Sequence, residues 1–167
     1  MGVRIRYLVV LAVVLAAAPV AGAAPAFKGN VCGLLTAKQV TAIQGVTAAC
    51  KNAAPLPGPG SKQYTGNWAG ATPKSPGLQV TVVHYTDPGV LQLAVHNLKQ
   101  GLSGGAPTKV TGIGDAAYEA KGPAGNGPGI HVAIGKYIAY INLTEGGPAL
   151  SPSVLEPIAK DVVAKLS

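Results

Sequence analysis

The chain has 167 residues, of which 48% are hydrophobic, and its 13 Lys and Arg against 6 Asp and Glu give a formal net charge of +7. This length allows one domain with a hydrophobic core. Both arginines lie at positions 4 and 6, and the lysines that follow are scattered. That pattern excludes a nucleic-acid surface of clustered Arg and Lys with interleaved aromatic residues.

Residues 1–24 have the pattern of a secretory signal peptide. The two arginines precede an unbroken apolar run, Tyr7 to Ala18, which is short for a membrane span. Small residues at Ala21 and Ala23 then occupy the two positions that a signal peptidase reads, so we expect cleavage near Ala23 or Ala24. A retained anchor helix is the alternative.

Residues 25–167 are predicted to form a single domain with no membrane span. Eleven lysines against six acidic residues give it a net charge of +5, which favours solubility and weak attraction to anionic wall polymers. Cys32 follows Asn30 and Val31, a poor match to a lipoprotein attachment site. We therefore expect a secreted protein, either extracellular or associated with the cell wall.

Cys32 and Cys50 are the two cysteines of the chain. Two cysteines in an exported protein are expected to pair. They enclose 17 residues, and closing a loop of this size stabilises a fold by about 3 kcal/mol in the loop-entropy treatment. A metal site would need further soft ligands nearby in the sequence, and none follows.

The segment between the cysteines predicts a short helix. Thr36 is a suitable N-cap, and Gln39 completes a capping box three residues later. Leu35 and Val40 flank the cap as a hydrophobic staple. The proline- and glycine-rich stretch over residues 53–62 is interpreted as a connection to the first strand.

Two strands are predicted next, over Gln63–Ala69 and Leu78–Thr86, and their short turn favours an antiparallel pair. In the second strand, one face carries Leu78, Val80 and Val82, and the other carries Gln79, Thr81, Val83 and Tyr85. Alternation of this kind is typical of a strand that buries at least one face.

A second helix is predicted after the strand pair, with Asp87 as N-cap and Pro88 at its first position. Its apolar stripe consists of Leu91, Ala94, Val95, Leu98 and Leu102. A strand over Lys109–Lys121 follows, interrupted by Gly112 and Gly114.

The last part of the chain predicts a hairpin and a third helix. Strands over Ile130–Ile134 and Tyr137–Thr144 are joined by Gly135-Lys136, a good type II′ turn. Ser151 caps the final helix, with Pro152 at its first position. The resulting order is α-β-β-α-β-β-β-α, which favours an α+β domain: an antiparallel sheet with the helices packed on one face.

Two motifs carry a resemblance to a known family. The first is Cys32-Gly33-Leu34-Leu35-Thr36, followed by Cys50, and the second is Val110-Thr111-Gly112-Ile113-Gly114-Asp115-Ala116-Ala117. With these motifs the chain resembles the domain-of-unknown-function family of small secreted proteins and lipoproteins from high-GC Gram-positive bacteria. It is similar, more loosely, to the extracellular sensor domains of their membrane kinases. The resemblance implies a fold and a cell-envelope address but no catalytic residues, and Trp68 comes later than the family's tryptophan.

Two glycine motifs suggest enzymatic sites. Gly112 to Asp115 lacks the third glycine and the following helix of a dinucleotide fingerprint, so we interpret it as a turn into a strand, with Asp115 accepting hydrogen bonds from its own loop. Gly101 to Gly105 matches Gly-x-Ser-x-Gly, and Ser103, Asp115 and His131 follow in the order of a hydrolase triad. A nucleophile elbow, however, needs a strand before the serine and a helix after it.

Histidines and carboxylates offer two weaker candidates. His84, His96 and His131 are scattered over different predicted elements, which disfavours a metal site. Asp115 and Glu119 are the two carboxylates that would share one face of a strand, in the manner of a glycosidase pair.

Most aromatic residues fall on predicted strands, where they line a groove on an uncovered sheet face or pack across strands. Our candidate ligand-binding residues are Trp68, Tyr85, Asp115 and Tyr118. The sequence thus favours a non-catalytic binding module without a cofactor, whose partner is a small molecule or an envelope component. A small hydrolase using Ser103/Asp115/His131 or Asp115/Glu119 is the alternative, and a purely structural envelope protein is a third reading.

Overall fold

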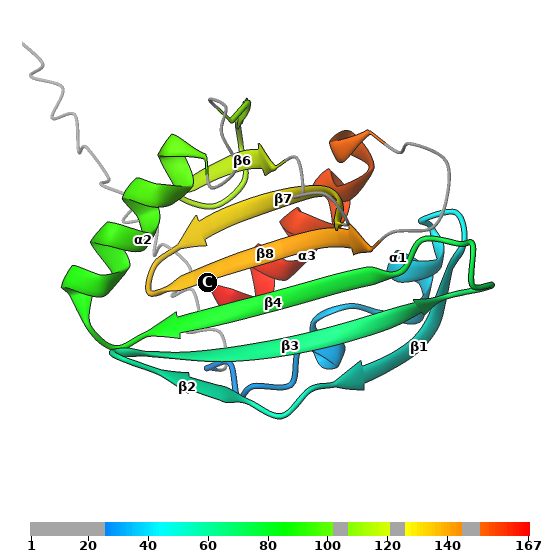
Figure 1. Ribbon diagram of the computed structural model, residues 1–167, viewed down its shortest axis with the longest axis horizontal. Coiled ribbons are helices and arrows are strands. Elements are labelled where there is room, and N and C mark those ends of the chain that lie inside the picture. The colour runs from blue at the N-terminus through cyan, green and yellow to red at the C-terminus, as the bar shows by residue number, and fades with distance from the viewer. Residues whose placement is uncertain (1–25, 102–106, 121–125, 145–150) are drawn as a thin grey trace, which may run out of the picture.

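The computed structural model describes residues 26–101, 107–120, 126–144 and 151–167, which form an eight-stranded antiparallel sheet with three α-helices (Figure 1). The elements before the central helix are η1 (Cys32–Leu34), α1 (Ala37–Thr41), β1 (Val46–Asn52), β2 (Leu56–Gly58), β3 (Ser61–Gly70) and β4 (Leu78–Tyr85). Those from it onward are α2 (Pro88–Gln100), β5 (Lys109–Val110), β6 (Ala116–Ala120), β7 (Asn126–Ile134), β8 (Tyr137–Thr144), η2 (Pro152–Leu155) and α3 (Glu156–Leu166). The α+β class with an antiparallel sheet is confirmed.

The strands lie in the order β1-β3-β4-β8-β7-β6-β5, and β2 also pairs with β3. The contact of β4 with β8 joins the first half of the sheet to the second, with Thr81 opposite Tyr140. Because every pairing is antiparallel, residues that face each other across strands share one face of the sheet.

The first face of the sheet carries the main core. Val80, Val82 and Ile141 are fully buried there against residues of α1 and α3, such as Val40 and Val162. At about 25 cal/mol for each Å² of apolar surface removed from water, this layer supplies most of the driving force for folding.

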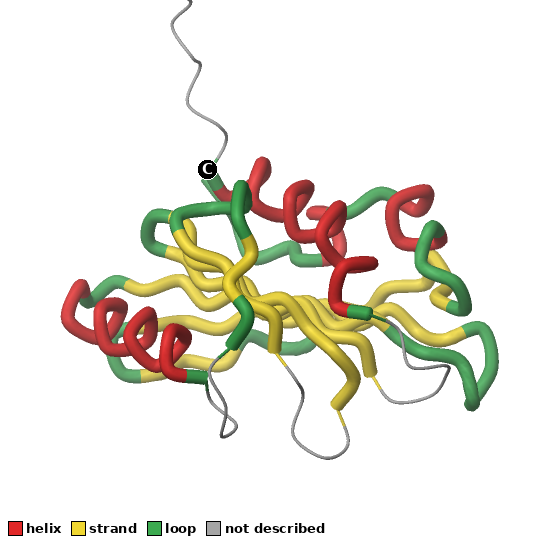
Figure 2. Tube along the Cα trace, turned by 90° about the horizontal axis from the view of Figure 1, so that it is seen from above, coloured by secondary structure: helices red, strands yellow, loops and turns green. Residues whose placement is uncertain are grey.

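The second face carries a smaller core under α2. Leu98 of α2 packs with Val83 and Ile138, which alternate with the residues of the main core. Figure 2 shows the sheet running between α2 and the other two α-helices. The prediction that the helices share one face is therefore wrong for α2. The apolar stripe of α2 packs on this second face because β4 and β8 carry apolar residues on both faces at this end of the sheet.

The predicted element order is also wrong before the first strand pair. The helix between the cysteines ends at Thr41, and Gly45, with φ 90°, turns the chain into β1. The proline-rich stretch contains β2, which pairs with β3 at the sheet edge. An edge position leaves one side of the strand free of ladder bonds, and there proline is tolerated. In the second half, the broken strand forms two separate strands, β5 and β6.

The helix starts and the hairpin agree with the sequence patterns. The Thr36 amide donates to Gln39 Oε1 at 2.6 Å, and the Gln39 amide donates to Thr36 Oγ1 at 3.3 Å, which completes the capping box. Asp87 Oδ1 accepts from the amide of Gly89 at 2.7 Å and caps α2. Gly135 has φ 52°, as the first position of a type II′ turn requires.

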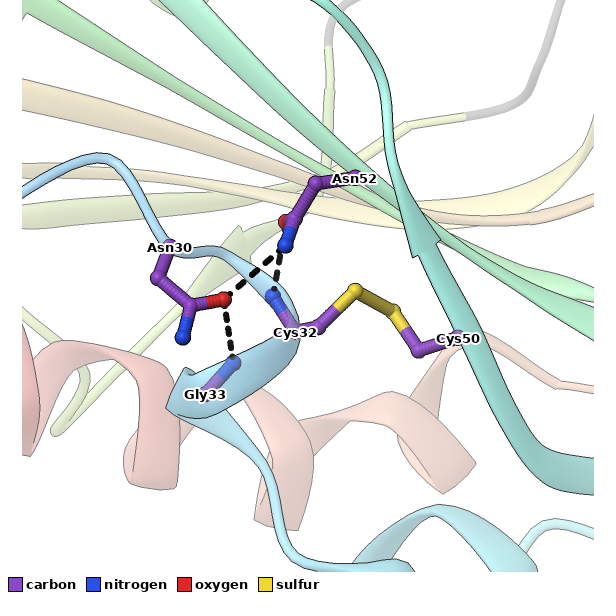
Figure 3. Close-up of a disulfide and its surroundings, with 5 residues drawn as sticks. All are labelled: Asn30, Cys32, Gly33, Cys50 and Asn52. Atoms are coloured by element: carbon purple, nitrogen blue, oxygen red, sulfur yellow. Dashed lines mark hydrogen bonds between the residues drawn. A yellow bond between two sulfur atoms is a disulfide. The ribbon is translucent and has the colours of Figure 1, made fainter.

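The disulfide between Cys32 and Cys50 is present and joins η1 to β1 (Figure 3). Two asparagine side chains lie beside it. The Cys32 amide donates to Asn52 Oδ1 at 3.1 Å, and Asn52 Nδ2 donates to Asn30 Oδ1 at 2.9 Å. Asn30 Oδ1 also accepts from the Gly33 amide at 3.2 Å. The first described residues are thus joined to the edge strand β1 by one covalent bond and two hydrogen bonds, while the bond of Gly33 to Asn30 lies within the segment itself.

Candidate binding surface on the second sheet face

The second face of the sheet divides into an apolar end and a polar remainder. Among the described residues, α2 is the helix that packs on this face, over Val83, Ala133 and Ile138. Beyond that end, the alternation of β4 and β8 places polar side chains on the same face, at Thr81 and Asn142 among others.

Two adjacent cross-strand rows form this polar region, which we call the polar strip. The first row consists of Thr65, Thr81, Tyr140, His131 and Tyr118, with Lys109 at its end. The second row consists of Asn67, Gln79 and Asn142, with Lys51 at its end. The first row crosses six strands, a width of about 24 Å at the usual strand spacing.

The side chains of the polar strip hydrogen-bond to one another across strands. The hydroxyls of Thr65 and Thr81 are 3.1 Å apart, and Gln79 Nε2 donates to Asn67 Oδ1 at 2.9 Å. His131 Nε2 lies 3.2 Å from Asn142 Oδ1. These bonds fix the orientation of the amides, while the remaining donors and acceptors of the half-buried groups stay available to a ligand.

A glycine makes room for the amide of Asn142. Gly129 lies opposite Asn142, and a Cβ at Gly129 would collide with the side-chain oxygen of Asn142. Any other residue at position 129 would therefore displace the amide from its place beside His131.

His131 and Tyr140 of the polar strip are uncharged at neutral pH. Burial lowers the pKa of His131 from its ordinary 6.5, and the hydrogen bond with Asn142 offsets only part of that shift. Burial also raises the pKa of Tyr140, helped by the neighbouring Tyr85. The rings of His131 and Tyr140 meet edge to face, with centroids 4.8 Å apart. Positive charge is confined to the two ends of the rows, at Lys51 and Lys109.

The four ligand-binding candidates from the sequence do not lie together. Trp68 is 4% exposed and belongs to the core of the first face. Tyr85 is buried beside α2, where its hydroxyl hydrogen-bonds with Tyr140. Tyr118 is a member of the polar strip. Asp115 is exposed and lies outside it.

The glycine stretch before β6 is a turn, as predicted, but Asp115 has a different partner from the one expected. Gly112 and Gly114 have φ of 76° and 56°, which L side chains rarely adopt. Asp115 Oδ2 accepts from the Gly135 amide at 2.7 Å, and not from its own loop. The carboxylate thus joins this turn to the β7–β8 hairpin.

Among the residues that the structure describes, the side chains of the two enzyme alternatives are not brought together. Ser103 lies outside the described residues. The side-chain partner of Asp115 is the Gly135 amide and that of His131 is Asn142. Asp115 and Glu119 are four residues apart along nearly extended chain, so about 13 Å separates their Cα atoms, against carboxyl separations of about 5–9.5 Å in glycosidases.

The histidines are dispersed in space. His84 is on β4, His96 is exposed on α2, and His131 is in the polar strip. Within the described parts of the chain, no three His, Cys, Asp or Glu side chains are grouped closely enough to hold a metal ion. In the same parts, no helix is long and apolar enough to cross a membrane.

The sequence did not predict that the amides of Gln79 and Asn142 and the ring of His131 lie together in the polar strip. The alternation in β4 assigns Gln79 and Thr81 to one face, but only the pairing of β4 with β8 and of β8 with β7 brings Asn142 and His131 beside them. No protein-family model matches the sequence, and no curated protein or solved structure is significantly similar to it. The family resemblance therefore stays a prediction.

Proposed function

We propose that this protein is a non-catalytic, secreted or envelope-associated binding module that holds a neutral, hydroxyl-rich polymer, such as a cell-wall glycan, on the polar strip. The observation that carries the proposal is the row of uncharged amide and hydroxyl side chains already oriented by cross-strand hydrogen bonds. Groups held in place before binding lose little side-chain entropy when a ligand arrives.

The chemistry of the polar strip favours hydroxyls over charged groups. Amides offer both donors and acceptors, as a sugar hydroxyl requires. The rings of His131, Tyr140 and Tyr118 add half-buried apolar edges among the polar atoms. The carboxylate of Asp115 accepts from the Gly135 amide outside the polar strip, so its negative charge does not lie among the amides.

Binding to isolated cell-wall polysaccharide, measured by co-sedimentation and by NMR shifts of the polar strip, tests the proposal. Gln79→Ala combined with Asn142→Ala should weaken binding by about tenfold or more, because each lost hydrogen bond contributes about 1 kcal/mol. The matched control is Gln92→Ala with Asn97→Ala, two exposed residues on α2.

Three results would count against the proposal: no saturable binding, an equal loss in the control, or shifts confined to other surfaces. Labelling of Ser103 by a fluorophosphonate probe, abolished in Ser103→Ala, would favour the hydrolase instead.

A further inference from the structure

A cluster of aromatic rings lies on the first face of the sheet, at the end where β3 begins and β4 ends. The ring of Phe27 meets Tyr64 at a centroid distance of 5.4 Å and Tyr137 at 6.1 Å, both edge to face. His84 lies 5.0 Å from the Tyr137 ring. Tyr137 is buried, whereas Phe27, Tyr64 and His84 are half-buried and reach the surface.

Lysines surround this aromatic cluster. Lys62 Nζ lies 5.5 Å from the Tyr64 ring centroid, and Lys136 Nζ lies 5.7 Å from the Tyr137 centroid, both within cation–π range. Lys28 follows Phe27 in the sequence and is exposed. Burial lowers the pKa of His84, and the positive charge of Lys136 adds to that shift. We call these rings and lysines the aromatic–lysine patch.

Two carboxylates lie at the same end of the sheet, and both are hydrogen-bonded to backbone amides. Asp87 caps α2, which packs on the other face, and Asp115 accepts from Gly135. The three lysines of the patch, in contrast, are exposed.

The position of the patch along the chain places it close to the apolar segment at the N-terminus. Phe27 comes nine residues after Ala18, the last residue of the apolar run. Even a fully extended chain of that length spans only about 30 Å. While the apolar run is in a bilayer, the aromatic–lysine patch is therefore held near the membrane surface.

We infer that the aromatic–lysine patch docks on the headgroups of an anionic phospholipid bilayer. Lysines contact the lipid phosphates and the half-buried rings lie at the level of the headgroups, the arrangement that membrane interfaces favour. This surface lies on the opposite face from the polar strip, so the inference does not depend on the proposed function.

Co-sedimentation of the purified protein, in the form that its host exports, with vesicles tests the inference. Phosphatidylcholine vesicles containing phosphatidylglycerol should bind the protein, and pure phosphatidylcholine vesicles should bind it much more weakly. Lys62→Gln with Lys136→Gln should weaken binding by about fivefold for each lysine removed. The matched control is Lys38→Gln with Lys74→Gln, which removes the same charge from the other end of the sheet, and circular dichroism verifies that each variant is folded.

Four outcomes would overturn the inference. Equal binding to neutral vesicles would assign membrane association to the apolar N-terminus, and equal losses in both double variants would assign it to net charge alone. Undiminished binding of Lys62→Gln/Lys136→Gln would exclude the patch. Binding to soluble polyphosphate through the same lysines, without binding to vesicles, would identify a phosphate polymer in place of a bilayer.

Discussion

Removing the disulfide with Cys32→Ala and Cys50→Ala tests how the chain is held at its first edge strand. The cysteines are 18 residues apart, and freeing a loop of this size in the unfolded chain costs the fold about 3 kcal/mol. For a domain of this size the loss corresponds to a fall in Tm of about 10 °C. The folded state should persist, because the hydrogen bonds of Asn30 and Asn52 still join η1 to β1.

Urea unfolding followed by tryptophan fluorescence measures the effect, since Trp68 is buried opposite Cys50. Reduced wild-type protein is the control and should match the double variant. A loss below about 1 kcal/mol would refute the loop-entropy reasoning. NMR evidence that β1 detaches from β3 in the variant would show instead that the bond acts on the folded state.

Three further predictions concern single positions. Gly114→Val should lower the free energy of unfolding by about 2–4 kcal/mol in a urea titration, since a Cβ there would lie 2.6 Å from Ala133 O at a φ of +56°. Asp115→Asn keeps an acceptor for the Gly135 amide and should lower it by about 1 kcal/mol or less. Equal stabilities of the two variants would contradict this prediction. Because the pKa of His131 is lowered in the folded state, the unfolded chain binds more protons below pH 6.5, and stability falls as the pH drops through that value. His131→Gln should therefore reduce the change in urea midpoint between about pH 7.5 and 5.5. An unchanged pH profile would exclude His131 as a source of the pH-dependent stability. Leu98→Ala should destabilise the fold by about 2–4 kcal/mol, because Leu98 is 3% exposed between α2 and the sheet; a near-neutral result would show that α2 contributes little to the second core.

Local structure was predictable at helix starts and tight turns, because few residue types can satisfy the backbone there. Thr36 with Gln39, Asp87 with Pro88, and Gly135 each satisfy a cap or turn that few other residues would satisfy. β1 was missed because its sequence is mostly small or polar and has no alternating apolar residues. The stripe on α2 predicts burial, but a stripe does not specify which face of the sheet receives it.

The polar strip was not predictable as a site because register is set by tertiary structure. Alternation with period two assigns Gln79 to a face, yet it does not say that Asn142 lies opposite. His131 reaches Asn142 only through the hairpin register of β7 and β8.

The shared edge of β3 has a consequence for solubility. β1 pairs with one part of β3 and β2 with another, so the outer side of a ten-residue strand is divided between two short partners. β2 is three residues long with Pro57 at its centre, and proline has no amide hydrogen to offer an incoming strand. An open edge of that length would be a template for pairing with another chain. Pro57, which belongs to a linker-like stretch of the sequence, therefore makes this edge less able to pair with another chain, which disfavours domain swapping and fibril growth.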